Sequence, residues 1–253
     1  MKRIVTFILG LFIMSAAINA QTVNCDFGVD QKIKLENGDI YQKMVGADKT
    51  GFYVLKTDYE NNIWIEFWNS DNLVKESSNR LILPSVGGVK AEFKEMFYIN
   101  EKLIMFTTVT NESIKQKTLY AQHVNKAGKI IGESKPIGRL TNQNIVVDFD
   151  VRLTENEKNI FVNYYRPFQK YNEEPYFLKF YDADLNEVLN KTIKLPLVDR
   201  EFNIIQFVVM DNLDILMLAK LKPQSDKRSR RGPEVFEYSI LMYDVELSRV
   251  TEY

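Results

Sequence analysis

The chain has almost no cysteine or histidine. Cys25 is the only cysteine and His123 the only histidine among 253 residues. A lone cysteine excludes a disulfide within the chain, and the residues before Cys25 lack the small side chain expected ahead of a lipid-bearing cysteine, so we interpret it as an incidental thiol. A lone histidine excludes a histidine-rich metal site, and no nucleophile motif accompanies it. We therefore expect no metal, no cofactor and a structural role for His123.

No charge of one sign dominates either. The sequence has 33 Lys and Arg side chains against 34 Asp and Glu. This balance gives no drive toward nucleic acid or an anionic membrane surface. Beyond the amino terminus, no segment approaches the roughly 20 apolar residues of a membrane span. We expect no transmembrane segment after signal cleavage.

The amino terminus has the pattern of a secretory signal. Lys2 and Arg3 precede an apolar run from Ile4 to Met14, and Ala20 ends a small-residue cleavage site. The run is short for a membrane span, and a retained anchor stays open as the alternative. We predict a signal peptide over 1–20, a mature domain over 21–253, and export to the periplasm or the extracellular space.

The sequence does contain one design repeated four times. An apolar strand reaches an Asn or Asp, turns, and resumes, as from Tyr176 through Asp182 to Pro196. The turn-opening residue falls at 69, 125, 182 and 244, with spacings of 56, 57 and 62 residues. A fixed period of this size indicates a repeat architecture. The short Asn or Asp side chain favours a turn because it accepts hydrogen bonds from backbone two residues on.

Four strands are predicted in each repeat. The first alternates polar and apolar residues, as over 147–153, and the second is apolar on both faces, as over 103–106. The two-strand unit around the turn follows and ends at Arg80–Pro84 in the first repeat. No segment has capped helical spacing, so we expect negligible helix. The predicted repeats cover roughly 41–84, 90–140, 145–196 and 201–253.

On this period and strand order, residues 30–253 resemble the β-propeller superfamily and, more loosely, propeller-like repeat proteins exported by bacteria. No Trp-Asp pair ends a strand, and Gly87-Gly88 stands alone in a loop. The resemblance implies an all-β propeller of about four four-stranded blades, with a central channel and ligands at one face. Two alternatives stay open: closure by an amino-terminal strand at Lys32–Leu35, or an incomplete part of a larger propeller.

Long predicted loops join the second and third strands of the last two repeats. Loops on one side of a rigid scaffold are where binding usually occurs. The loop at 166–175 offers a guanidinium with aromatic surface, and the loop at 222–233 is basic. Packing of the first loop and solvation of the second are the plainer interpretations. The candidate ligand-binding residues are Arg166, Phe168, Tyr171, Arg228, Arg230 and Arg231.

Two carboxylates are the candidates for catalysis. Asp148 and Asp150 share one face of a predicted strand, about 6.5–7 Å apart, with Arg152 following. This separation suits acid–base work on a glycosidic bond, although acidic residues on a wet strand face need no special role. The sequence thus favours an exported non-catalytic module that binds a protein or glycan at its long-loop face. The alternative is a carbohydrate-active hydrolase or lyase with these carboxylates in the channel.

Overall fold

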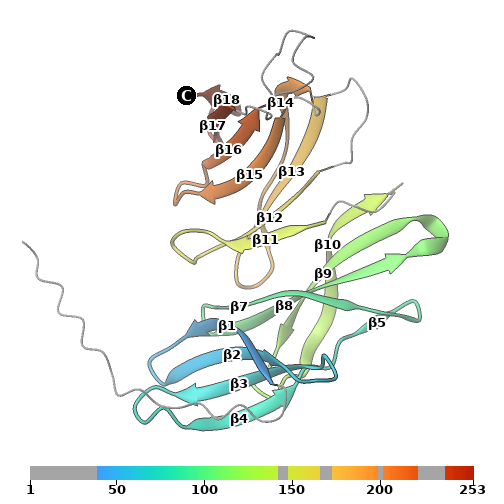
Figure 1. Ribbon diagram of the computed structural model, residues 1–253, viewed down its shortest axis with the longest axis vertical. Coiled ribbons are helices and arrows are strands. Elements are labelled where there is room, and N and C mark those ends of the chain that lie inside the picture. Colours follow the sequence, from blue (N-terminus) through green and yellow to red (C-terminus); the bar gives the residue numbers. More distant parts are fainter. Residues whose placement is uncertain (1–38, 142–147, 166–172, 199–201, 222–236) are drawn as a thin grey trace, which may run out of the picture. The chain divides into compact units, whose positions relative to one another are not determined.

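Alternating strands and tight turns produce four consecutive four-stranded antiparallel sheets (Figure 1). The computed structural model describes residues 39–141, 148–165, 173–198, 202–221 and 237–253. Within each sheet, every strand pairs with its chain neighbour, as in the blades of a propeller. The predicted all-β class and the four-stranded antiparallel blades are confirmed.

The first sheet sets the pattern that the others follow. It consists of β1 (Ile40–Ala47), β2 (Gly51–Thr57), β3 (Ile63–Asn69) and β4 (Lys75–Arg80). The prediction that its last strand runs to Pro84 was wrong, because β4 ends at Arg80. A short hairpin of β5 (Ser85–Val86) and β6 (Val89–Lys90) follows. Gly87 and Gly88 form its two-residue turn with positive φ angles of 58° and 81°, which glycine adopts without strain.

The second sheet repeats this order of strands. Its strands are β7 (Glu92–Ile99), β8 (Lys102–Asn111), β9 (Gln116–Val124) and β10 (Ile130–Thr141). The single 3-10 turn in the described residues, η1 (Glu112–Ile114), joins β8 to β9. No helix in the described part of the chain is long and apolar enough to cross a membrane.

The third and fourth sheets repeat the arrangement. The third consists of β11 (Asp150–Leu153), β12 (Ile160–Tyr165), β13 (Glu173–Tyr181) and β14 (Glu187–Val198). The fourth consists of β15 (Phe202–Val209), β16 (Ile215–Leu221), β17 (Glu237–Asp244) and β18 (Arg249–Glu252). The predicted strand at 147–153 is shorter in the structure and begins at Asp150. Its alternation is present, since Phe149 and Val151 are buried and the aspartates are not.

The last strand of the fourth sheet bears on the closure hypothesis. β18 pairs with Leu241–Asp244, so that half of the outer position beside β17 is already filled. The strand predicted at Lys32–Leu35 lies outside the described residues. Both alternatives for the ends of the propeller stay predictions.

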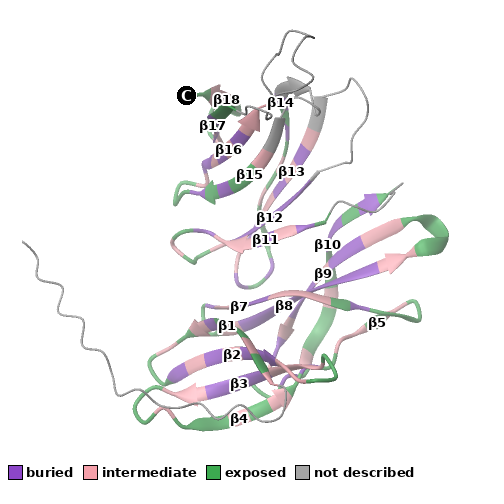
Figure 2. Cartoon of the chain, viewed as in Figure 1, coloured by how far each residue is buried: buried purple, intermediate pink, exposed green. Residues whose placement is uncertain are grey.

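Burial alternates along the strands because successive side chains point to opposite faces (Figure 2). The buried apolar residues form three core clusters, each between two consecutive sheets. Ion pairs add to this packing between the first three sheets. Lys43 of β1 pairs with Glu95 of β7 at 2.6 Å, and Lys94 of β7 pairs with Asp148, just before β11, at 2.6 Å. Apolar packing therefore holds consecutive sheets face to face, and charge adds to it at these two junctions.

Candidate functional site

In each sheet, the turn from the first strand to the second and the turn from the third to the fourth lie at the same end, which we call the turn end. The four predicted Asn and Asp residues open the turns between the third and fourth strands. The Oδ1 atom of Asn125 accepts bonds from Ala127 N and Lys129 N at 3.0 and 2.9 Å. Equivalent bonds reach Asn69, Asp182 and Asp244 from backbone amides two or three residues on. The predicted turn chemistry is confirmed.

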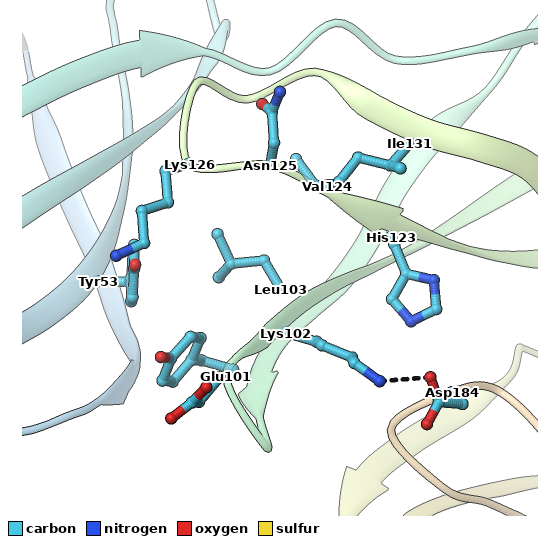
Figure 3. Close-up of a pocket in the computed structure, with 11 residues that line it drawn as sticks. Tyr53, Glu101, Lys102, Leu103, His123, Val124, Asn125, Lys126, Ile131 and Asp184 are labelled. Carbon is cyan, nitrogen blue, oxygen red and sulfur yellow. Dashed lines mark hydrogen bonds and ion pairs between the residues drawn. The ribbon is translucent and has the colours of Figure 1, made fainter.

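The turn of the third sheet is docked onto the second sheet. His123 Nε2 lies 2.8 Å from Ala183 O, and Lys135 Nζ donates to Leu185 O at 2.5 Å. Lys102 forms an ion pair with Asp184 (Figure 3). Because a carbonyl only accepts, His123 carries a proton on Nε2. The lone histidine thus positions one sheet's turn on its neighbour.

The turn of the second sheet docks in the same way onto the first. Asn79 Nδ2 donates to Lys126 O at 3.1 Å. A Cβ atom at Gly128 would lie 3.1 Å from Arg80 O, and its φ of 74° also favours glycine. The Lys126 ammonium lies 5.9 Å from the Tyr53 ring centroid and 5.2 Å from that of Phe67. Both turns bring polar side chains of one sheet against aromatic or backbone groups of another.

A pocket of about 370 Å³ lies among these docked turns (Figure 3). This size is within the range of about 300–1,000 Å³ for small-molecule sites. The first three sheets all contribute to its wall, from β2, from the turns that follow β7 and β9, and from the turn that follows β13. The lining residues are Tyr53, Tyr98, Glu101, Lys102, Leu103, His123, Val124, Asn125, Lys126, Ile131 and Asp184.

Tyr53 is the most unusual group in this wall. Its side chain is 1% exposed, and its hydroxyl has no hydrogen-bond partner among the described residues. The Lys126 ammonium lies 5.9 Å from the centroid of the Tyr53 ring, and its contact with Tyr53 raises the pKa of Lys126. A buried hydroxyl without a partner costs roughly 1–3 kcal/mol. The wall of the pocket therefore contains a buried polar group that the described residues leave without a hydrogen-bond partner.

Tyr98 supports Tyr53 from the next sheet. The two rings lie 4.8 Å apart between centroids, tilted by 38°. Tyr98 Oη donates to Asp48 Oδ2 at 2.8 Å, and burial together with this carboxylate raises the pKa of Tyr98. Bonds from Thr50, Tyr98 and Gly51 hold the pKa of Asp48 at about 2. The aromatic wall is thus fixed by an ionised carboxylate in the first turn of the chain's first sheet.

The charges of the wall balance. Glu101 and Asp184 are acidic, and Lys102 and Lys126 are basic. Leu103, Val124 and Ile131 supply apolar surface. In the described residues no cluster of three His, Cys, Asp or Glu side chains could hold a metal ion. The arrangement suits a neutral ligand that has both apolar faces and hydrogen-bonding groups.

The candidate catalytic carboxylates lie elsewhere and are held by cations. Asp148 pairs with Lys94 at 2.6 Å and with Lys117 at 2.9 Å. Burial alone would raise the pKa of Asp148, but the bonds from Lys117 and Lys94 outweigh it and lower the pKa. Asp150 accepts two bonds of 2.8 Å from Arg152 Nε, and Arg152 also donates to Phe207 O. Both aspartates therefore anchor contacts between or within sheets.

The loop residues proposed from sequence lie outside the described residues. This applies to Arg166, Phe168 and Tyr171 in the range 166–172, and to Arg228, Arg230 and Arg231 in the range 222–236. The described ends of the flanking strands, Tyr165 with Glu173 and Leu221 with Glu237, lie opposite the turn end. Binding at the long loops stays a prediction, and the described pocket lies at the other end.

Comparison with known proteins adds a similarity of fold layout. No protein-family model and no curated sequence matches the chain. Among solved structures, the chain is similar to one described as the crystal structure of a thermostable family-43 glycoside hydrolase. The identity is 14% and the TM-score 0.42, over 86% of this chain and 73% of that chain. We transfer no activity from this match.

Sequence reasoning did not find the pocket. The second strand of each repeat is predicted to be apolar on both faces, and 52–55 is such a run, so Tyr53 is indistinguishable there from any other buried ring. One signal was present, because a tyrosine in such a run needs a partner for its hydroxyl. A second was the polar pair Asn100 and Glu101 between two apolar runs, which predicts a tight turn. Neither signal identifies the neighbouring sheets that complete the wall.

Proposed function

We propose that the chain is an exported, non-catalytic binding module that holds a saccharide unit of a glycan in the turn-end pocket. The observation that carries this proposal is the buried hydroxyl of Tyr53, which has no hydrogen-bond partner in the described residues and belongs to a residue that lines a cavity with a charge-balanced wall. A sugar presents apolar C–H faces and a rim of hydroxyl groups. Both kinds of surface have a counterpart in this wall.

The contacts can be assigned by chemistry. The Tyr53 and Tyr98 rings and Leu103 supply the apolar surface against which the C–H face packs. Glu101 and Asn125 supply acceptors and donors for the sugar hydroxyls, and Tyr53 Oη supplies one more. A neutral sugar leaves the ion pair between Lys102 and Asp184 intact. A strongly charged ligand would have to compete with that pair.

Ion pairing at Asp148 and Asp150 supports a non-catalytic role. A glycosidase needs one carboxylic acid with a raised pKa to protonate the leaving group. The lowered pKa of Asp148 is the opposite of this requirement. Asp150 is engaged at both oxygens by Arg152. These contacts favour a scaffold role for the two residues over the hydrolase or lyase alternative.

The test compares Tyr53→Phe with the native chain. The substitution removes only the hydroxyl, so glycan affinity measured by calorimetry should fall about fivefold to tenfold, as for one lost hydrogen bond of about 1 kcal/mol. The melting temperature should stay equal or rise, because the empty pocket no longer buries an unsatisfied group. Tyr59→Phe, at a tyrosine 75% exposed at the opposite end of the first sheet, is the matched control.

Glycan screening of the native chain comes first. Retention of a neutral oligosaccharide by the native chain and by an Asp148→Asn, Asp150→Asn double variant would support binding without catalysis. Failure to retain any glycan, or equal affinity of the native chain and Tyr53→Phe, would exclude the pocket as the site. Product release that the double variant abolishes would restore the enzyme hypothesis.

A further inference from the structure

The turn between the third and fourth strands of a sheet docks on the outer strand of the preceding sheet at two junctions. On the first sheet, Asn79 of β4 donates to Lys126 O in the turn of the second sheet at 3.1 Å. On the second sheet, Lys135 of β10 donates to Leu185 O in the turn of the third sheet at 2.5 Å. At both junctions, a carbonyl of the turn therefore satisfies a donor of the neighbouring outer strand.

The junction between the third and fourth sheets lacks this polar contact. Val245, which opens the turn of the fourth sheet, packs in the same core as Leu189 of β14. Within the described residues, however, no hydrogen bond or ion pair joins the turn residues 245–248 to β14. The amides of Val245 and Leu247 donate to carboxylates of the fourth sheet itself. Apolar packing alone closes this junction.

One position of the turn differs between the three junctions. Gly128, Leu185 and Ser248 are the residues of these turns with positive φ angles, at 74°, 61° and 51°. Leu185 is 4% exposed, and a Cβ atom at Gly128 would lie 3.1 Å from Arg80 O, so both positions are closed by the preceding sheet. Ser248 is exposed and lines a cavity of about 580 Å³ between β14 and the turn from β17 to β18.

The cavity at this open junction is cationic. Lys191, Lys194 and Arg249 line it, and no carboxylate does. Lys191 shares the strand face of Ile193, which is buried in the core with the fourth sheet, so its side chain points toward that sheet. Neither Lys191 nor Arg249 forms an ion pair or a side-chain hydrogen bond within the described residues. Asp244 lies opposite Arg249 in the ladder, but its Oδ1 atom accepts a bond from Leu247 N instead.

We infer that this cavity binds a small anion that carries a phosphate, sulfate or carboxylate group. The Arg249 guanidinium can hold two oxygens of such a group at once, and the Lys191 ammonium adds a compact positive charge. The hydroxyls of Thr192 and Ser248, which also line the cavity, are further donors, and Val250 supplies apolar surface. The anion would provide the acceptors that a turn carbonyl provides at the other two junctions. This site is separate from the turn-end pocket and does not rest on the proposed function.

Calorimetry of the full native chain at low ionic strength tests the inference. The probes are phenyl phosphate, phenyl sulfate and benzoate, with phenol as the neutral control of similar size. We expect at least one anion to bind, phenol not to bind, and the affinity to fall as salt is added, because salt screens charge. Inorganic phosphate and sulfate are titrated as well. Comparison of these ions with the phenyl esters identifies whether the site takes the free ion or an anionic group on a larger molecule.

Three variants and one control locate the site. Lys191→Gln and Arg249→Gln should each lower the affinity about tenfold or more, as for a lost hydrogen bond to a charged group. Lys158→Gln removes the same charge from an exposed position of the third sheet and should bind like the native chain. Ser248→Leu places at this position the residue type that Leu185 supplies in the third sheet, where leucine adopts the same positive φ. It should fill the cavity and abolish binding without loss of the fold by far-UV circular dichroism.

The inference would be overturned if no anion bound to the native chain, or if phenol bound as tightly as the anions. Native affinity in Lys191→Gln and Arg249→Gln would exclude these cations as ligands. An equal loss in Lys158→Gln would show attraction by overall charge and not by a site. Full binding by a folded Ser248→Leu variant would show that the anion lies elsewhere. Tyr53→Phe should leave anion affinity unchanged, so the outcome is independent of the glycan proposal.

Discussion

The first and fourth sheets each leave one face outside the cores, and they stabilise those faces by different means. On the first sheet, Glu66 is fully buried and accepts bonds from Tyr41, Ser78, Trp68 and two lysines. On the fourth sheet, the face outside the core carries mainly aliphatic side chains, among them Val208, Leu216 and Ile240. Charge and hydrogen bonds fix specific rotamers, whereas aliphatic side chains need only cover. The face of the first sheet that carries Glu66 is thus a rigid polar and aromatic surface, and the face of the fourth sheet that carries Leu216 is an adaptable apolar one.

Of the changes that distinguish the two sheets, removal of the Glu66 carboxylate should lower the free energy of unfolding most. Lys56 is 6% exposed and lies 3.0 Å from Glu66. Glu66→Ala leaves that ammonium in a buried site with Asp39 as its other partner, at a cost of roughly 3–5 kcal/mol. Urea unfolding followed by tryptophan fluorescence measures it, since Trp64 and Trp68 are the only tryptophans and both lie in the first sheet.

A matched variant separates charge from packing. Glu66→Ala combined with Lys56→Met removes both charges, so it should recover a large part of the lost stability. Equal instability of the single and double variants would show that the cavity, and not the unpaired ammonium, is responsible.

The next largest effect is the difference in stability cost between alanine substitutions on the two faces of β16. Met217 is 0% exposed in the core shared with the third sheet, whereas Leu216 lies on the opposite face of the strand and is half-buried. We expect Met217→Ala to lower the free energy of unfolding by about 2–4 kcal/mol, as for a core methionine. Leu216→Ala should cost less than half of that. Equal costs by urea unfolding would mean that the face with Leu216 is as well covered as the core.

Acid should loosen the first sheet before the fourth. Burial would raise the pKa of Glu66, but bonds from Lys56, Tyr41 and Ser78 lower it, and the pKa of Asp48 is about 2. A lowered pKa stabilises the fold above the ordinary value of about 4, and this stability is lost as the pH falls through the lowered value. Tryptophan emission should therefore change between about pH 4 and pH 2 ahead of far-UV circular dichroism. Coincident changes would contradict the difference between the sheets.

The smallest effect is expected at Ile240. Its side chain is 48% exposed, and threonine keeps the β-branched shape that suits a strand. Ile240→Thr should change the stability of the monomer by no more than about 0.5 kcal/mol. Urea unfolding measures this change, and a clearly larger loss of stability would show that Ile240 is covered within the chain.

Local features of this fold could be read from the sequence. The turns at Asn125 and Asp182 do not depend on the rest of the fold, because the side chains accept bonds from backbone amides only two to four residues along the chain. The alternation of Phe149 and Val151 with polar neighbours predicted which face of that segment is buried. The candidate site could not be read from the sequence in this way. Asp148 was predicted as a catalytic candidate because its ion-pair partners, Lys94 and Lys117, lie 54 and 31 residues away along the chain and local sequence does not reveal them.

The sequence by itself determined four strand units of similar length, their tight turns and the apolar alternation that makes them pack face to face. Those properties depend on backbone geometry and on neighbours a few residues away. Only the tertiary structure decided that Tyr53 ends in a pocket, that His123 holds another sheet's turn, and that Glu66 is buried among two lysines. Each of these depends on contacts between strands or sheets, for which local sequence carries no distance information.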